Sequence, residues 1–209
     1  EMVSAACAIA QYAEEDPFAG LPEKAQLATE FPELSLYHPW DIEAEKAIEM
    51  AIECENAARF YDKKITNSEG ASIHTFEGIR VLANSLGFNH GYASSRHSMS
   101  CSVIGEQEGA MQRDYWYTVA RCASDLDSPE KVGKRASERT IKRLGSQPIS
   151  TRKSPVMFAA EVGGGLIGHF ISAIKGGNLY RKSSFLLDSL GQQIFPSFID
   201  IYEQPLLSK

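Results

Sequence analysis

The pattern of apolar and polar positions divides the chain into a helical stretch, an alternating stretch and a second helical stretch. In the first, Ile48, Ala51 and Ile52 recur at the spacing of one helix face, and acidic residues stand at its start. Asp41 is a good N-cap, since its carboxylate can accept hydrogen bonds from the free backbone N–H groups of the first turn. The pattern therefore predicts a helix from Asp41 to about Phe60.

An alternating pattern, typical of half-buried strands, occupies the region from Ile65 to Ala123. Tyr115 and Tyr117 fall on one side of the alternation and Trp116 on the other, and β-branched and aromatic residues are frequent. Short loops between the strands favour an antiparallel meander. We expect a turn at 67–70, a loop at 105–109 and strands at Ser72–Asn84, Gly91–Ile104 and Ala110–Arg121.

The second helical stretch has clear signals at both ends. Ser128 is the expected N-cap and Pro129 the first helical residue, a position where the N–H that proline lacks would be unpaired anyway. Lys142 and Arg143 place positive charge at the negative end of the helix dipole, and Gly145 suits the left-handed residue that ends many helices. These signals predict a helix that begins after Ser128 and stops at Gly145.

Shorter elements are expected on both sides of this centre. Before it, the sequence predicts helices at 2–15 and 24–31. Prolines between Phe18 and Pro39, and the polar run 146–154, mark two boundaries. After the second boundary we expect a strand at 156–158, a helix at 159–174 ended by Gly176 and Gly177, a helix at 183–190 and a strand at 198–202.

The predicted elements give an α+β fold, an antiparallel sheet with flanking helices. We expect three parts: residues 1–40 as the tail of an N-terminal domain with a Pro-rich connector, 41–148 as a central α+β domain, and 149–209 as the start of a C-terminal domain. Because the chain starts at Glu1 inside a helix-like apolar run, we interpret it as a fragment of a larger protein.

Composition narrows the class of protein. Of 209 residues, 43% are hydrophobic and 23% charged, which is typical of a globular chain and excludes disorder. No apolar run approaches the ~18 residues of a membrane span. The 27 acidic and 21 basic side chains give a net charge of -6, which disfavours nucleic-acid binding. The four cysteines lack CxxC and zinc-finger spacing, so we expect buried or semi-buried free thiols in a reducing cytosol.

A run of three glycines, 163–165, interrupts the helical pattern after the predicted strand at 156–158. A phosphate-cradling loop is one interpretation, but the run lies inside the predicted helix and no GxxxxGKS/T motif accompanies it. Close approach of another backbone to the helix is the favoured interpretation. His169 follows the run. As a zinc ligand it would need at least two further ligands, and none stands four residues before it.

Three further clusters allow both a functional and a structural interpretation. His90 and His97 could form a two-histidine strand site, but a polar, half-exposed strand is favoured. Asp125, Asp127 and Glu130 lack the EF-hand pattern and fit better as carboxylates at a helix start. A basic stripe could bind nucleic acid, but a solvated helix face balanced by glutamates is favoured; the stripe comprises Lys134, Arg135, Arg139, Lys142 and Arg143.

Several segments together resemble one protein family. In order and spacing they are similar to the TldD/PmbA family across nearly the whole chain, and most similar to its PmbA branch, also called TldE. Each segment alone is a weak signal, and their combination is specific. They include ITNSEGAS at 65–72, MQRDYWY at 111–117, DLDSPEKVG at 125–133, GH at 168–169 and GGNLYRKSSFL at 176–186.

The resemblance implies a two-subunit cytosolic metalloprotease. In that family, TldD-type subunits carry an HExxxH zinc motif, whereas TldE-type subunits lack it and pair with TldD. On this resemblance Gly164 stands at the first ligand position, Gly165 at the position of the catalytic glutamate, and the second histidine alone is kept, as His169. We therefore expect no catalytic residue and no zinc in this chain, with His169 as a weak metal candidate.

The function that the resemblance implies is that of a metal-free, non-catalytic PmbA/TldE-type subunit in a TldD–TldE complex. The complex would cleave unfolded or leader peptides in the cytoplasm. The expected partners are a zinc-bearing TldD-type subunit and extended peptides, with no membrane and with nucleic acid disfavoured. Two alternatives stay open. One is an active zinc metallopeptidase with an unusual site, and the other is a regulatory binding protein, since the family has an older description as a DNA gyrase modulator.

Overall fold

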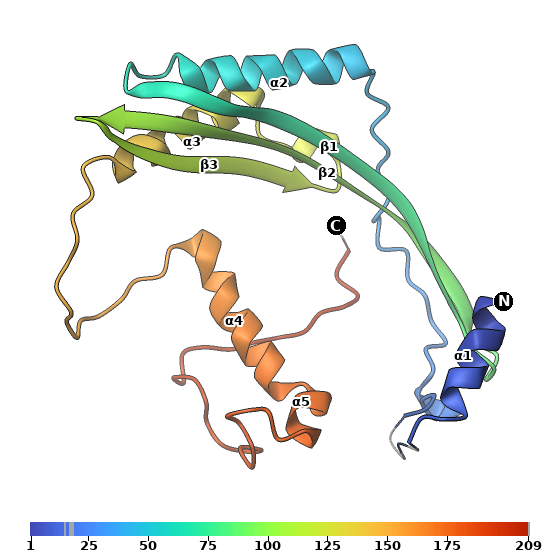
Figure 1. Ribbon diagram of the computed structural model, residues 1–209. Coiled ribbons are helices and arrows are strands. Elements are labelled where there is room, and N and C mark those ends of the chain that lie inside the picture. The colour runs from blue at the N-terminus through green and yellow to red at the C-terminus, as the bar shows by residue number, and fades with distance from the viewer. Residues whose placement is uncertain (15, 17–18, 209) are drawn as a thin grey trace. The chain divides into compact units, whose positions relative to one another are not determined.

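A three-stranded antiparallel sheet forms the centre of the larger of two compact units in the chain, which comprises residues 1–146 and the C-terminal residues from 206 (Figure 1). The computed structural model describes residues 1–14, 16 and 19–208, and the second unit comprises residues 147–205. The strands β1, β2 and β3 pair in that order, at Ile65–Ala83, Asn89–Gln107 and Ala110–Ala120. The predicted antiparallel meander and the α+β class are thus confirmed.

β1 and β2 are longer than predicted, because the chain passes through two expected turns as strand. Residues 67–70 lie inside β1, where the register against β2 slips and Gly70 has a φ of 99°. Such a bulge needs a positive φ, which glycine adopts without strain. β2 continues through most of the predicted loop, so that only Glu108 and Gly109, with φ of 54° and 78°, connect it to β3. Two successive positive φ angles are typical of a tight hairpin turn.

Two helices cover one face of the sheet, as Figure 1 shows. The first, α2, spans Ala44–Arg59 and has Glu43, not Asp41, as its N-cap residue. The predicted cap was wrong because the chain is still extended before Glu43, and the backbone N–H of Trp40 is held by the Glu77 carboxylate at 3.3 Å. The helix can begin only after this attachment to the sheet.

The second covering helix, α3, spans Pro129–Arg143 and has the ends that the sequence predicted. The Ser128 hydroxyl accepts a hydrogen bond from the backbone N–H of Lys131 at 3.3 Å, which satisfies one of the free donors of the first turn. Gly145 follows the helix with a φ of 70°. The left-handed residue expected at this end is therefore present.

The core between the helices and the sheet is built from small and medium-sized side chains. α3 lies close against α2 at Gly133, where an added methyl group would overlap the carbonyl oxygen of Cys54 and lie 3.0 Å from the backbone nitrogen of Ala58. Only glycine permits this approach. The other core residues include Met99, Cys101 and Val103 of β2 and Val132 and Ala136 of α3.

Residues 36–40 form a strap that runs beside β2 beyond the end of β3. The pairing of β3 with β2 ends at His97, and from there Ser95 of β2 donates its backbone N–H to the Leu36 carbonyl at 3.0 Å. The Ser95 hydroxyl accepts the N–H of His38 at 2.8 Å, and Tyr37 donates to Glu77 at 2.9 Å. The end of the predicted Pro-rich connector is therefore anchored to the sheet.

The segments before the strap contain less helix than predicted. α1 covers Met2–Ala10 of the expected helix at 2–15, and residue 15 lies outside the described residues. The helix predicted at 24–31 is reduced to a 3₁₀ turn, Lys24–Gln26, because the backbone becomes extended at Leu27. In the described part of the chain, no helix has the length and apolar character needed to cross a membrane.

The second unit contains the predicted helix but lacks the other predicted elements. α4 spans Ala160–Ile174 and α5 spans Gly176–Tyr180, so Lys175 separates two helices where Gly176 was expected to end one. The strands predicted at 156–158 and 198–202 do not form, and no strand pairs with either segment in the described chain. The helix predicted at 183–190 does not form: these residues make turns, and Asp188 has a φ of 60°, which is incompatible with an α-helix.

We predict that Gly133→Ala destabilises the first unit by about 2 kcal/mol or more, because the added methyl group must displace the Cys54 carbonyl. At an open helix position the same change would stabilise by about 1 kcal/mol. Trp40 and Trp116 both lie in this unit, so urea unfolding followed by tryptophan fluorescence reports on it. The exposed Lys142→Ala on the same helix is the control and should shift the unfolding free energy by less than about 0.5 kcal/mol. An unchanged or stabilised G133A variant would contradict the close approach.

Candidate functional site

The three positions of the degenerate motif lie on α4. Gly164, Gly165 and His169 are all exposed, and the helix is regular through them. Side chains five residues apart on a regular helix point about 140° away from each other, so positions 164 and 169 do not share a face. Among the described residues, no three His, Cys, Asp or Glu side chains gather as a metal site would require. The motif positions on α4 thus present one imidazole and no second donor side chain.

The glycines of α4 are not explained by close packing, which was the favoured interpretation. A methyl group added at Gly163, Gly164 or Gly165 would meet no atom within 4 Å in the described chain. α4 buries Ala173, near its C-terminal end, and its glycine-rich half faces open space. The prediction of a neighbouring backbone against this run is therefore wrong.

His90 and His97 do not form a paired site. His97 is fully buried, with Nδ1 2.8 Å from the Thr75 hydroxyl and Nε2 2.8 Å from the His38 carbonyl oxygen. Because a carbonyl can only accept, Nε2 carries the proton, and both ring nitrogens are engaged. His90 instead stacks on Phe31, with ring centroids 3.8 Å apart. Both histidines thus have structural roles, but the expectation of a half-exposed strand was wrong at His97, which is buried and fastens the strap to β2.

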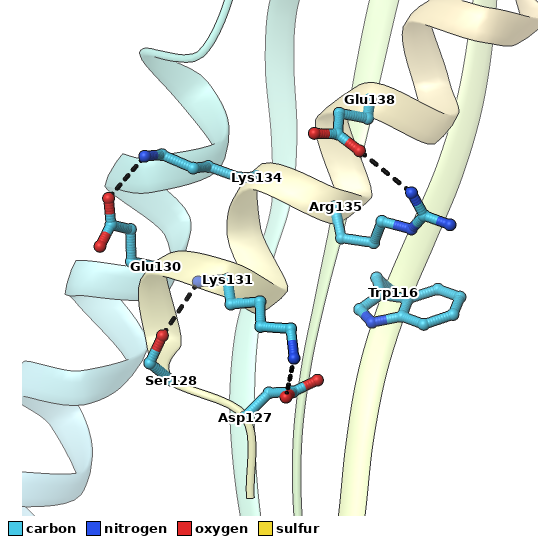
Figure 2. A pocket seen from close by; sticks show the side chains of 8 residues that line it. All are labelled: Trp116, Asp127, Ser128, Glu130, Lys131, Lys134, Arg135 and Glu138. Atoms are coloured by element: carbon cyan, nitrogen blue, oxygen red, sulfur yellow. Dashed lines mark hydrogen bonds and ion pairs between the residues drawn. The ribbon is translucent and has the colours of Figure 1, made fainter.

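The basic stripe of α3 lies beside a shallow hollow of about 570 Å³ (Figure 2). Figure 2 shows the charged side chains around it joined in pairs along the helix. The pairs are Lys131 with Asp127 at 2.5 Å, Lys134 with Glu130 at 2.5 Å and Arg135 with Glu138 at 3.1 Å. The ammonium group of Lys134 lowers the pKa of Glu130, so this pair persists at neutral pH and is lost only as the pH falls through the lowered value.

Trp116 and Asp114 of β3 hold the remaining arginines of the stripe. The guanidinium carbons of Arg135 and Arg139 lie 5.3 and 5.1 Å from the Trp116 ring centroid. The buried Asp114 carboxylate lies 3.5 Å from Nε of Arg139 and 3.6 Å from Nη1 of Arg143. The balanced helix face that the sequence favoured is confirmed, and Lys134 and the three arginines of the stripe are engaged in contacts within the first unit.

A second hollow, of about 290 Å³, lies at the β1 bulge on the opposite face of the sheet. Its rim carries Glu69, which accepts a hydrogen bond from the Ser102 hydroxyl at 2.7 Å and pairs with Arg113 at 3.0 Å. The hydrogen bond from Ser102, followed by the charge of Arg113, lowers the pKa of Glu69. The hydroxyls of Ser72 and Ser100 lie 3.0 Å apart and also line the hollow.

The cysteines are free, as expected, but their burial varies. Cys54 and Cys101 are buried together in the core, and the hydrogen bond with Cys101, together with burial, raises the pKa of Cys54. Cys122 is half-buried. Cys7 is exposed on α1, a helix in which no residue is buried, so the expectation of burial was wrong for this residue. Neither core thiol is reachable from solvent as a nucleophile.

Comparison with known families identifies both parts of the chain. The profile of the PmbA/TldA metallopeptidase central domain matches residues 37–144, and that of the PmbA/TldA metallopeptidase C-terminal domain matches residues 151–209. The chain belongs to the PmbA/TldD family. The first matched region begins within the strap and ends just after α3, so it contains the whole sheet and both covering helices.

Curated relatives within the PmbA/TldD family are similar over almost the whole chain. Metalloprotease PmbA of Escherichia coli O157:H7 is 50% identical over 207 residues, which is 99% of this chain and 46% of the relative. A metalloprotease PmbA homologue of Haemophilus influenzae is 47% identical over 98% of this chain and 46% of its own length. The chain spans slightly less than half the length of these relatives.

Solved structures share the fold. A protein of Bacteroides thetaiotaomicron, described as a candidate modulator of DNA gyrase, superposes with a TM-score of 0.78 at 25% identity, over 90% of this chain and 43% of that one. TldE of Thermococcus kodakarensis gives a TM-score of 0.57 at 17% identity, over 89% of this chain and 42% of that one. At 17% identity, the second likeness concerns the fold alone.

Sequence reasoning missed the strap and the hollow at the bulge. The strap has no helical or alternating pattern, and its attachment depends on Ser95 and His97, which are distant in sequence. The hollow had a detectable signal, since serines at every second position of β2 (98, 100 and 102) indicate a strand face that is not apolar. Residues 67–70 were interpreted as a turn, and this concealed the position of Glu69.

We predict that Asp114→Asn destabilises the first unit by about 2 kcal/mol, because Arg139 and Arg143 lose the buried carboxylate that faces them. The amide can still accept the hydrogen bond that the backbone N–H of Tyr115 gives to Asp114, so packing is preserved. Urea unfolding followed by tryptophan fluorescence measures the loss. The control is Glu130→Gln, which removes a carboxylate from an exposed pair and should leave the midpoint unchanged. Equal effects of the two variants would show that burial of Asp114 does not matter.

Proposed function

We propose that this chain is part of a PmbA/TldE-type subunit that pairs with a zinc-bearing TldD-type metalloprotease and takes no direct part in the cleavage step. The observation that carries the proposal is the composition of the motif positions on α4, where Gly164 and Gly165 precede an exposed His169. The family membership supplies the setting, a metallopeptidase.

The chemistry of the side chains supports a non-catalytic role. A catalytic zinc site needs three protein ligands, and a general base must take the proton from the attacking water. Glycine offers no donor atom at position 164 and no carboxylate at position 165. His169 alone does not fit a zinc site, so we assign no hydrolytic step to this chain and place the zinc in the partner subunit.

The proposed substrates are unfolded proteins and leader peptides, held in an extended conformation inside the complex in the cytoplasm. Relatives named metalloprotease PmbA at 50% and 47% identity support a role in proteolysis. An extended peptide can be held through its backbone at a strand edge and through its side chains on a sheet face. The exposed strands of the first unit offer both.

A regulatory role on DNA gyrase is the second candidate, because two structures similar in fold are described as candidate modulators of DNA gyrase. The basic stripe of α3 would be the surface for a nucleic-acid complex. Its arginines and Lys134 are already paired with carboxylates or stacked on Trp116, and the chain has a net charge of -6. Electrostatics therefore favour the peptidase setting over nucleic-acid binding.

We predict that the full-length protein, purified without a TldD-type subunit, contains no stoichiometric zinc and cleaves no unfolded peptide. Adding a TldD-type protein should restore cleavage of a quenched-fluorescence peptide. In this mixture His169→Ala should leave the rate within about twofold, whereas changing the motif glutamate of the TldD-type subunit to glutamine should abolish it. Atomic emission gives zinc per chain, and size-exclusion chromatography reports whether the complex forms.

The alternatives give different results in the same experiment. One zinc per chain that is lost in His169→Ala would establish an active site in this subunit and overturn the proposal. Failure to form a complex with any TldD-type protein, together with salt-dependent binding of DNA, would favour the regulatory alternative. A wild-type complex whose zinc and activity depend on the TldD-type subunit alone supports the proposal.

A further inference from the structure

The face of the sheet that points away from α2 and α3 has its own composition. We call it the open face, and it consists of every second position of β1 from Ser72 to Leu82, of β2 from Tyr92 to Ser102, and of β3 from Arg113 to Val119. The register places Phe76 opposite Arg96 and Arg80 opposite Tyr92. Phe76, Tyr92, Tyr115 and Tyr117 are between 45% and 62% exposed, so large rings stand on this face without covering partners.

The open face lacks negative charge. No position in the set defined above is Asp or Glu, although the chain has 27 acidic against 21 basic residues. Arg80 and Arg96 are exposed, and neither has an ion pair in the described chain. Glu69 borders the face at the bulge, where the ion pair with Arg113 balances its charge and a hydrogen bond from Ser102 holds its carboxylate. An acidic protein thus carries one sheet face of positive sign.

The surface shape of the open face suits an extended segment of polypeptide. Small residues follow one another along the central strand β2 at Ser98, Ser100 and Ser102, and the hollow of about 290 Å³ lies at the end of this row. On the β3 side the row is flanked by Tyr115 and Tyr117, whose rings are stacked with centroids 6.3 Å apart. The Ser102 hydroxyl donates to Glu69 and the Ser100 hydroxyl is bonded to that of Ser72, but a hydroxyl in such a bond can still accept a hydrogen bond from a backbone N–H.

We propose that the open face binds an acidic, extended segment of polypeptide, with carboxylates directed to Arg80 and Arg96 and the backbone laid along the serines of β2. Arg80 of β1 lies opposite Tyr92, and Arg96 follows four residues further along β2. The two guanidinium groups therefore suit a segment with acidic side chains about 13 Å apart along its length. Two arginines are too few for the continuous phosphate contacts that hold a nucleic acid. The inference rests on the proposed function, which supplies the polypeptide, and it adds the charge of the preferred substrate.

The test is direct binding of labelled peptides to this chain, followed by fluorescence anisotropy at low salt. The probes are peptides of alternating glutamate and serine, glutamine and serine, or lysine and serine. We expect the glutamate peptide to bind and the other two to bind at least about tenfold more weakly. The double variant Arg80→Ser and Arg96→Ser should bind the glutamate peptide with about tenfold lower affinity, since two exposed charge pairs are lost.

The matched control is Arg59→Ser combined with Lys63→Ser, which removes the same charge from exposed positions outside the open face. This pair should change the affinity by less than about twofold. Equal loss in the two double variants would mean unspecific attraction and would overturn the proposal. Tighter binding of single-stranded DNA than of the glutamate peptide would also overturn the proposal. A third contradicting result would be self-association of the chain that is lost in the Arg80 and Arg96 variant and is not inhibited by the peptide.

The two proposals can fail separately. If the full-length protein forms an active complex with a TldD-type subunit but the glutamate peptide does not bind, only the inference about the open face is wrong. If the glutamate peptide binds to the wild type and not to the arginine variant, while zinc is found in this chain, only the assignment of a non-catalytic role is wrong. In the complex, the variant with both Arg80→Ser and Arg96→Ser should have a higher KM for acidic peptides and an unchanged kcat.

Discussion

Side chains of an extended strand point alternately to the two faces of a sheet, and this alternation decides what each part of the first unit does. Along β2, Met99, Cys101 and Val103 enter the core beneath α2 and α3, while the serines between them face away. A slip of one residue would exchange the two sets and bury the serines. The bulge at Gly70 shifts the register at one end of β1 and leaves the pairing from Ala71 to Ala83 regular. The open face therefore keeps a uniform composition over most of its length.

The core is small, so its polar groups matter for how closely the layers approach. Ser137 of α3 donates to the Ala58 carbonyl of α2 at 2.7 Å, beside the place where Gly133 lets the two backbones meet. Ser95 and His97 likewise join β2 to the strap through hydrogen bonds to the backbone of His38. The buried hydroxyls of Ser95, Ser137 and Thr140 and both ring nitrogens of His97 have hydrogen-bond partners, which avoids the desolvation penalty of an unpaired polar group. The layers are thus fixed by hydrogen bonds at points where apolar contact area is limited.

Local signals predicted most of the first unit, and the errors occurred where distant contacts override them. The end signals of α3 gave its limits because capping depends on adjacent residues such as Ser128 and Gly145. Asp41 had an equally good local signal and failed, since the strap holds the chain extended up to Glu43. Gly70 was taken for a turn because a bulge and a turn both require a positive φ. In the second unit, apolar runs such as 156–158 predicted strands for which the described chain provides no partner.

In the proposed non-catalytic role, this chain contributes to a peptidase through binding, and the binding of a charged segment depends on how the charge of the chain is distributed. The net charge of -6 repels an acidic segment from most of the surface, whereas the open face carries Arg80 and Arg96 and no carboxylate. A negatively charged surface with one positive face orients such a segment before contact, and this orientation contributes more to the rate of association than to the final affinity. The α3 stripe is a poorer site for the same segment, because Lys134 and its three arginines already face Glu130, Glu138 and Asp114. Charge and sheet alternation together thus direct an extended acidic segment to the serine row of β2.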